Sequence, residues 1–200
     1  MKRVRRMIIW LFGAIVLTFG LAACGWIYMT SNVAVPGYTI AEGDGDIEIR
    51  DYPELVVAEI TTRGSRQEAV RAGFPPLAGY IFAKEREGEK IAMTAPVTQR
   101  AEGDEWTVQF IMPDGYTLDT LPRPTGSRVT LSTEAPIRRA AIRFSGWWDD
   151  ESFAAREAKL RSWLAARGLS PDGAPIYAYY NDPFTPGFLR RKEVIFHFGR

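Results

Sequence analysis

The chain has 200 residues, and its 25 Lys and Arg side chains nearly balance its 24 Asp and Glu side chains. This balance gives no bulk electrostatic attraction to nucleic acid or to acidic substrates, so a nucleic-acid-binding role has no support. A single cysteine, Cys24, and a single histidine, His197, exclude a site built from two thiolates or from two imidazoles.

Residues 1–29 are predicted to be a membrane-targeting segment. Four cations at positions 2, 3, 5 and 6 precede an apolar stretch from Met7 to Met29. The positive-inside rule keeps such a basic cluster in the cytoplasm while the following residues cross the membrane. The stretch exceeds the ~20 residues that a helix needs to span the hydrocarbon core. We therefore expect a membrane-anchored protein whose C-terminal domain lies outside the cytoplasm, on the periplasmic face of a bacterial cell envelope.

Two kinds of anchor fit this segment. One is an uncleaved transmembrane helix, with Trp26 and Tyr28 at the far interface as part of an aromatic belt. The other is a lipid on Cys24, because Leu-Ala-Ala-Cys-Gly at 21–25 resembles a bacterial lipoprotein signal. Apolar residues follow Cys24, whereas a polar tether is usual in lipoproteins, and both models stay open. Residues 30–37 are predicted to be a linker that ends at Pro36-Gly37, and residues 38–200 a single domain.

The first half of this domain is predicted to fold in the order β, α, β, β. Two β-rich runs at 47–50 and 55–60 are separated by Tyr52-Pro53. Ser65 and Glu68 have capping-box spacing, which predicts a helix over 66–83 that Pro75-Pro76 must kink or begin. Two further strands are predicted over 91–100 and 106–112, joined by a turn at Glu102-Gly103-Asp104.

The second half repeats this order. Residues 128–145 are rich in strand formers, and Asp149 or Asp150 can cap a helix that ends at Gly168. One face of that helix is apolar and consists of Phe153, Leu160, Trp163 and Leu164. Strands are predicted over 176–180 and 193–198. The predicted fold class is therefore α+β, with a duplicated βαββ unit that forms a curved or barrel-like antiparallel sheet flanked by two helices.

Four strings, in order along the chain, resemble the SOUL, or haem-binding protein, family. They are Tyr38 to Pro53 with Ile49-Arg50 inside it, Lys90 to Val97 (KIAMTAPV), Arg143 to Gly146 (RFSG), and Tyr180 to Phe184 followed by Arg190 to Val194. The family's usual Arg-Arg-Asn-Glu is Arg-Arg-Lys-Glu here, with Lys192 in the Asn position. The resemblance implies a duplicated βαββ fold, an apolar cleft able to take a tetrapyrrole, and no defining catalytic residues.

The first helix offers a candidate ligand surface. Val70, Phe74, Leu77 and Ile81 recur at helical spacing and are expected to face the sheet as core. An adjacent strip combines a cation with small and aromatic residues, which suits a flat ring that bears propionates. We expect haem or another porphyrin to contact this strip, and Met93 to touch the ring through its polarisable thioether. The predicted cofactor-binding residues are Arg71, Phe74, Leu77, Ala78, Phe82 and Met93. Ordinary core or strand packing explains the residues around Met93 better, and a solvated arginine explains Arg71 at least as well.

His197 is predicted to be a rim residue and not an iron ligand. Alternation along 193–198 places Val194, Phe196 and Phe198 on one face of the strand and His197 on the other. The wholly apolar set is the better candidate for the core. No Gly-x-Ser-x-Gly elbow and no cluster of carboxylates and imidazoles accompanies His197, so we expect no catalytic site, no metal site and no enzyme activity.

Three functions remain open at this point. The first is an envelope-facing, membrane-tethered haem- or tetrapyrrole-binding module that acts as a carrier, buffer or sensor and does not need its ligand to fold. The second is a structural or interaction domain with the same fold. The third is a pocket for another amphipathic small molecule, since the duplicated unit also resembles bacterial effector-binding domains. An exposed apolar cleft beside the first helix would favour the two ligand-binding functions.

Overall fold

The computed structural model describes residue 25 and residues 33–84, 86–125 and 128–198. The chain divides into two units, Met1–Val33 and Ala34–Arg200. The described residues of the second unit contain nine strands, two long helices and a short 3-10 helix, which makes the class α+β. The elements in chain order are β1 (Thr39–Asp44), β2 (Ile47–Tyr52), β3 (Leu55–Arg63), α2 (Arg66–Ile81), β4 (Val97–Glu102), β5 (Glu105–Ile111), β6 (Thr130–Glu134), β7 (Ile137–Phe144), α3 (Asp150–Ala165), β8 (Pro171–Tyr179), η1 (Gly187–Leu189) and β9 (Lys192–Phe198).

All nine strands belong to one antiparallel sheet, in the order β1-β2-β7-β9-β8-β4-β5-β3-β6. The order β, α, β, β occurs twice along the chain, as β3-α2-β4-β5 and as β7-α3-β8-β9. The two halves meet where β4 pairs with β8, with Val97 opposite Tyr179. The strand order ends at β1 and β6, so among the described residues the sheet is open and does not close into the barrel that we considered.

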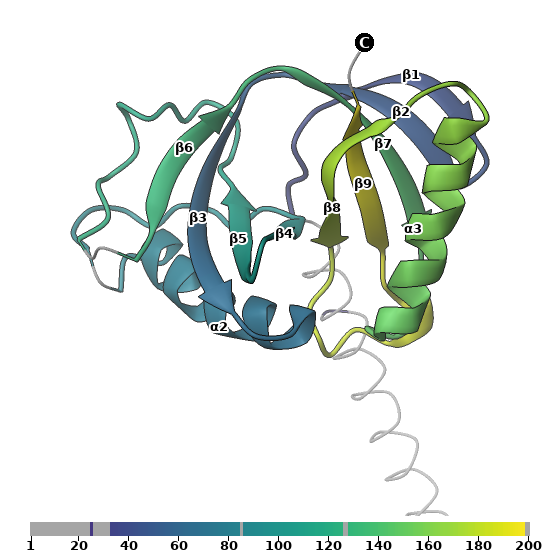
Figure 1. The fold of residues 1–200 in the computed structure, drawn as a ribbon. Coiled ribbons are helices and arrows are strands. Elements are labelled where there is room, and N and C mark those ends of the chain that lie inside the picture. Colours follow the sequence, from purple (N-terminus) through teal and green to yellow (C-terminus); the bar gives the residue numbers. More distant parts are fainter. Residues whose placement is uncertain (1–24, 26–32, 85, 126–127, 199–200) are drawn as a thin grey trace, which may run out of the picture. The chain divides into compact units, whose positions relative to one another are not determined.

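Both helices cover the same face of this sheet. Ala58 and Ile60 on β3 and Val108 and Phe110 on β5 belong to the hydrophobic cluster that contains Leu77 of α2. Successive strand residues point to opposite faces, and the register continues this face from Gln99 on β4 through Tyr177 on β8 to Val194 on β9. There α3 contributes to a second cluster with Phe153, Leu160 and Leu164. Figure 1 shows α2 beneath β3 and β5, and α3 beside β7.

The helices begin where the sequence predicts. The Ser65 hydroxyl accepts from the Glu68 amide, and the Glu68 carboxylate accepts from the Ser65 amide at 2.9 Å, which completes the capping box. α2 continues through Pro75 and Pro76 to Ile81, although proline has no N–H to donate to the helix. The Asp149 carboxylate caps α3 by accepting from the Ser152 amide at 2.7 Å.

Two stretches differ from the prediction. Residues 91–96 are not a strand: β4 begins at Val97, and before it only Thr94 bridges to Ala34. The Ile91 amide instead donates to the Ile81 carbonyl at 2.8 Å, and its side chain is buried in the α2 cluster, so this apolar run is a packed connection. β1 was not predicted, because all six of its residues are exposed and their sequence shows no alternation.

The helix-free face carries a buried ion pair. Arg50 donates two hydrogen bonds to the Glu193 carboxylate at 2.7 and 2.9 Å, and both side chains are at most 1 % exposed. The Tyr180 hydroxyl donates to the same carboxylate at 2.8 Å, and Arg191 lies beside it. Burial alone would raise the pKa of Glu193, but the hydrogen bonds and charge of Arg50 outweigh it and lower this pKa.

Lys192, which stands where the family usually has Asn, is also buried. Its ammonium donates to the Trp147 carbonyl and lies 4.6 Å from the centroid of the Phe144 ring and 5.2 Å from that of Phe153. Burial lowers the pKa of Lys192 to about 8. The lysine therefore holds the loop before α3 instead of making an amide-specific turn contact.

Candidate functional site

The structure distributes the six predicted ligand-contacting residues between the core and the surface. Leu77 is 0 % exposed and Ala78 is 9 % exposed, and both belong to the hydrophobic cluster between α2 and the sheet. Met93 is half-buried against the same cluster. Contact between a ligand and Leu77 would therefore require α2 to move away from the sheet.

The other three predicted residues are at least partly exposed, and Arg71 and Phe74 belong to α2 whereas Phe82 is its C-cap. Arg71 is exposed, and Phe74 and Phe82 are each 37 % exposed. The Phe74 ring packs edge-on against Phe110, with 5.2 Å between the ring centroids. Phe74 thus belongs partly to the core, as its helical spacing predicts.

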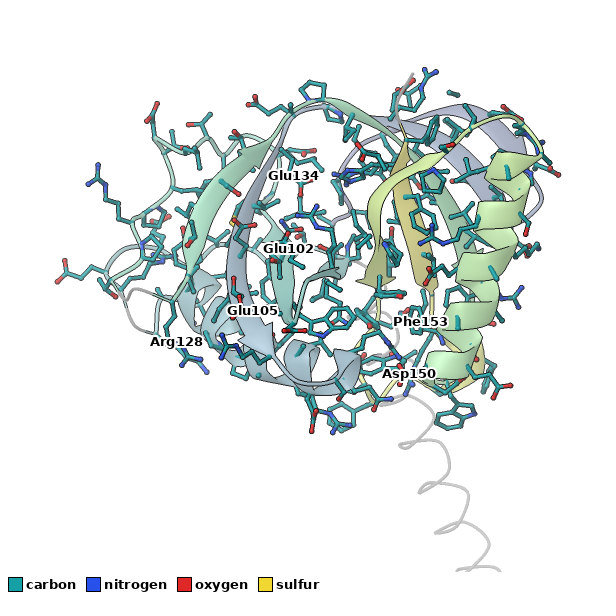
Figure 2. All side chains as sticks on the ribbon, in the orientation of Figure 1. Glu102, Glu105, Arg128, Glu134, Asp150 and Phe153 are labelled. Carbon is teal, nitrogen blue, oxygen red and sulfur yellow. The ribbon has the colours of Figure 1, made fainter. Side chains whose placement is uncertain are left out.

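A hollow of about 270 Å³ opens beside α2 at residues that the sequence did not indicate. Pro75, Pro76 and Tyr80 of α2 form one wall, and the segment after Leu121 forms the other, with Pro124, Thr125 and Val129. Arg86 and Arg128 complete the lining. None of the six predicted residues lines this hollow. Figure 2 shows Arg128 beside α2, where it can reach the rim.

Two arginines, Arg86 and Arg128, line the hollow. Arg86 is 9 % exposed, and its guanidinium donates to the carbonyls of Tyr80, Glu87 and Glu89 at 2.8–2.9 Å. Neither Arg86 nor Arg128 forms an ion pair with any residue that the structure describes. Arg86 is thus occupied by backbone carbonyls, whereas Arg128 is exposed and is the side chain through which the hollow can attract a carboxylate.

Tyr80 joins the hollow to the chain opposite it. Its hydroxyl donates to the Pro122 carbonyl at 2.9 Å, which fixes the loop after β5 against α2. Burial raises the pKa of Tyr80, so the phenol stays protonated at neutral pH. The Tyr80 side chain, which is only 4 % exposed, therefore supplies no phenolate ligand and little open surface to the hollow.

The sequence contained a partial signal for this hollow. Pro75-Pro76 is interpreted from the sequence as a kink or as the first turn of the helix, although two rings without N–H groups also make a rigid apolar wall. The second wall could not be found in this way, because it depends on how the segment between β5 and β6 returns to α2.

A second hollow, of about 420 Å³, lies at the helix-free face of β3, β4 and β5. Its lining is mostly charged or hydroxylic and includes Glu59, Glu102, Arg100 and Thr107. Figure 2 labels Glu102 there. Such a lining suits a polar solute better than a large apolar ring.

His197 lies on the sheet face opposite the helices, as its position in the strand predicts. It stands opposite Arg139 on β7, whereas Val194 and Phe196 belong to the α3 cluster and Phe198 packs against it. The imidazole is half-buried, and its Nε2 has no hydrogen-bond partner in the described part of the chain. Burial, together with the charge of Arg139, lowers the pKa of His197 to about 4, so the ring is neutral at physiological pH.

Comparison with known proteins identifies the family of this fold. The model of the family described as "SOUL heme-binding protein" matches residues 33–197. The chain belongs to the SOUL haem-binding family. Heme-binding protein 2 from Homo sapiens is 29% identical over 164 residues, which cover 76% of this chain and 80% of the human protein. Heme-binding protein 2 from Mus musculus is 28% identical over 149 residues, which cover 70% and 72%.

Solved structures share the fold of this SOUL-family chain at low sequence identity. A hydrolase from Listeria innocua has a TM-score of 0.56 at 15% identity and covers 80% of this chain and 94% of its own. The EcmrR C-terminal domain has a TM-score of 0.57 at 13% identity, with 82% and 98% covered. Their descriptions differ from one another, so these structures support the fold and leave the activity open.

The predicted membrane anchor falls almost entirely on residues that the structure does not describe. In the described residues, no helix is long and apolar enough to cross a membrane, but the predicted anchor at 7–29, including Cys24, lies outside them except for Gly25. The described residues also contain no group of three or more His, Cys, Asp or Glu side chains that could hold a metal ion.

Proposed function

We propose that this chain binds haem or a related porphyrin in the hollow beside α2, and that its first 29 residues hold it at the outer face of a membrane. The observation that carries the binding proposal is the hollow itself, which has Pro75 and Pro76 in one wall and is lined by Arg86 and Arg128, two arginines for which the described residues supply no ion pair. A tetrapyrrole has the matching chemistry, a flat apolar ring with carboxylates at one edge. Membership of the SOUL haem-binding family supports the same ligand class.

The volume of the hollow limits how tightly the ring is held. At about 270 Å³ it lies just below the ~300–1,000 Å³ of pockets that enclose a whole ligand. The bound ring therefore remains partly in contact with water. Such partial burial suits a carrier or buffer that must release its ligand, and we propose no catalytic step.

The proposed site does not depend on iron. His197 lies on the opposite face of the sheet, and the hydroxyl of Tyr80, the tyrosine that lines the hollow, is engaged with the Pro122 carbonyl. Coordination thus contributes little, and apolar contact with the ring contributes most. Metal-free protoporphyrin is expected to bind about as well as haemin.

The experiment is a titration of residues 31–200 with haemin and with protoporphyrin, followed by absorption and fluorescence. The four hydrophobic clusters of the described residues lie within residues 38–198, so residues 31–200 contain all of them. Arg128→Ala is expected to weaken binding of both ligands by about 1 kcal/mol, the scale of a charged hydrogen bond near the surface. Arg71→Ala is the matched control, because Arg71 is also exposed but does not line the hollow.

The outcomes separate the alternatives. Weaker binding in Arg71→Ala with normal binding in Arg128→Ala would move the ligand to the strip that the sequence indicated. Binding of haemin without binding of protoporphyrin, together with loss of the haem spectrum in His197→Ala, would assign an iron-ligating site instead. No binding of either compound would favour a structural domain or a pocket for a different amphipathic molecule.

A further inference from the structure

Two loops at one end of the domain expose large apolar side chains. Trp147 precedes α3 and is 70% exposed. Phe184 and Phe188 lie in the connection between β8 and β9 and are 79% and 78% exposed, and the adjacent Leu189 is 49% exposed. We refer to these four residues as the aromatic tip. Single exposed apolar residues are common, but four on adjoining loops make a patch of the kind that marks an interaction surface.

The second loop holds its aromatic residues in a fixed arrangement. Arg190 is only 8% exposed, and its guanidinium donates to the carbonyls of Thr185 and Pro183 at 2.6 and 2.7 Å. The Asp182 carboxylate accepts from the amides of Phe184 and Thr185 at 2.7 and 3.0 Å. The exposure of Phe184 and Phe188 is therefore built into a hydrogen-bonded loop and does not reflect an unanchored segment.

The two loops are fastened to each other. The Gly146 amide donates to the Gly187 carbonyl at 2.9 Å, and the buried Lys192 ammonium donates to the Trp147 carbonyl. A Cβ at Gly187 would lie 3.5 Å from the Trp147 ring, so the indole packs directly beside the second loop. Figure 1 shows the connection after β8 running beneath the N-terminal end of α3.

The aromatic tip lies at the end of the sheet where the chain enters the domain. Ala34 bridges to Thr94, and the Ala95 amide donates to the Ala34 carbonyl at 2.8 Å. Val97, three residues after Thr94, pairs with Tyr179, the last residue of β8, from which the second loop departs. A segment joined to Ala34 is therefore attached on the same side as the tip. Residues 30–34 span at most ~18 Å when extended, which limits the length of a tether between Ala34 and an anchor that ends near residue 29.

The charges near the tip point to an apolar contact and not to an anionic one. Arg190 and Lys192 are buried and occupied by backbone carbonyls. The exposed charges nearby are of both signs, with Asp150 and Glu151 at the start of α3 and Arg143 at the end of β7. Attraction to anionic lipid headgroups thus has little support, whereas Trp and Phe side chains favour the interfacial layer of any bilayer.

We propose that the aromatic tip inserts into the interfacial layer of the lipid bilayer to which the chain is anchored, and so fixes the orientation of the domain on the membrane. This inference rests on the membrane anchoring in the proposed function. Insertion removes four large apolar side chains from water without displacing any internal hydrogen bond. A second copy of the chain or another protein is a different occupant, and a quenching experiment in vesicles separates it from lipid.

The experiment uses the full chain in phosphatidylcholine vesicles whose lipids carry bromine near the headgroup end of the acyl chains. Bromine quenches indole emission on contact. The emission of Trp147 is obtained as the difference between the wild type and Trp147→Phe, a variant that keeps an aromatic ring in the tip. Trp106→Phe is the matched control, because Trp106 lies on β5 and its indole donates to the Gly64 carbonyl, away from the tip.

We expect the brominated lipid to remove most of the Trp147 emission and to leave that of Trp106 unchanged. Phe184→Ser combined with Phe188→Ser should restore the Trp147 emission, because the tip then lifts from the lipid. Adding phosphatidylglycerol should not change the result.

Trp147 emission that brominated lipid does not quench would overturn the inference, as would cross-linking through position 188 to a second copy. Flotation of the vesicles is scored separately: a chain that does not float with them refutes the anchor, whereas a floating chain with an unquenched Trp147 refutes only the tip.

Discussion

Glu193 is the residue on which the helix-free face of the sheet depends most. Its carboxylate accepts from Arg50 and Tyr180 and pairs with Arg191, and it is 0 % exposed. Removing one partner of a buried pair leaves the other charge without compensation, which costs about 3–5 kcal/mol. We expect Glu193→Gln to lower the free energy of unfolding of residues 31–200 by about 3 kcal/mol at pH 7, near the lower end of that range because Arg50 keeps its contact with Glu48. Urea denaturation measures this change.

The pH dependence of the same variant tests the cause. The pKa of Glu193 is lower in the folded chain than its usual 4.5, so its contribution is complete above that value and is lost as the pH falls through the folded pKa. The difference in stability between the wild type and Glu193→Gln should therefore shrink as the solution is acidified. Glu105→Gln is the control, because its pair with Arg63 is exposed and should contribute under ~1 kcal/mol. Equal losses in the two variants would contradict this assignment.

Among the elements, α2 approaches the sheet most closely at Gly73. A Cβ built there would lie 2.8 Å from both Cβ and Cγ2 of Val108 on β5 and 3.2 Å from Cγ2 of Ile60 on β3. Alanine favours a helix by up to ~1 kcal/mol over glycine, whereas overpacking a core costs about 1–3 kcal/mol. We expect overpacking to dominate, so that Gly73→Ala lowers the free energy of unfolding by about 1–2 kcal/mol.

A double-mutant cycle with Val108→Ala checks the origin of that loss. Removing Cγ2 of Val108 relieves one of the two closest contacts, so Gly73→Ala should cost less in the Val108→Ala background than in the wild type. Strictly additive losses would show that the contact with β5 is not the cause. The hollow beside α2 depends on the same position of the helix against the sheet, since Pro75, Pro76 and Tyr80 follow Gly73 on this helix.

The elements that could be predicted are those with local signals. Ser65 and Glu68 fix the start of α2, and Asp149 fixes the start of α3, because a cap is complete within four residues of sequence. The alternation of side chains along residues 193–198 was sufficient to assign the two faces of β9. Residues 91–96 were predicted wrongly because an apolar run that packs as a connection has the same composition as a buried strand.

The candidate site could not be predicted from local sequence patterns. The hollow needs a segment after Leu121 to lie against Pro75 and Pro76, and no pattern in either stretch points to the other. The buried pair is a similar case, because Arg50 and Glu193 are 143 positions apart in the sequence. Helical spacing did predict that Leu77 belongs to the core, but the predicted ligand strip beside it joined exposed residues such as Arg71 to Ala78, which is buried in the structure.

On the scale of the whole molecule, the two βαββ halves share one sheet and both helices lie on the same face of it. Arg66 at the start of α2 pairs with Asp150 at the start of α3, at 2.6 Å, and lies 4.1 Å from the centroid of the Phe153 ring. The N-terminal ends of the two helices therefore meet at the junction of the halves. The aromatic tip adjoins the start of α3, so its orientation on a membrane would set the direction in which both helices face.

The anchor and the topology can be tested together in one bacterial experiment. The four N-terminal cations precede the apolar stretch and should stay in the cytoplasm, so a phosphatase fused after Arg200 should be active only if the domain has crossed the membrane. We expect an active fusion in the wild type.

Only a lipoprotein depends on the thiol of Cys24, because the lipid is attached there. Cys24→Ala should therefore abolish lipid labelling and leave an uncleaved precursor if the anchor is a lipid, and should change neither mobility nor activity if it is a transmembrane helix. An inactive fusion alongside an active cytoplasmic reporter at the same site would reverse the topology whatever the anchor, because the orientation follows from the charges and not from Cys24.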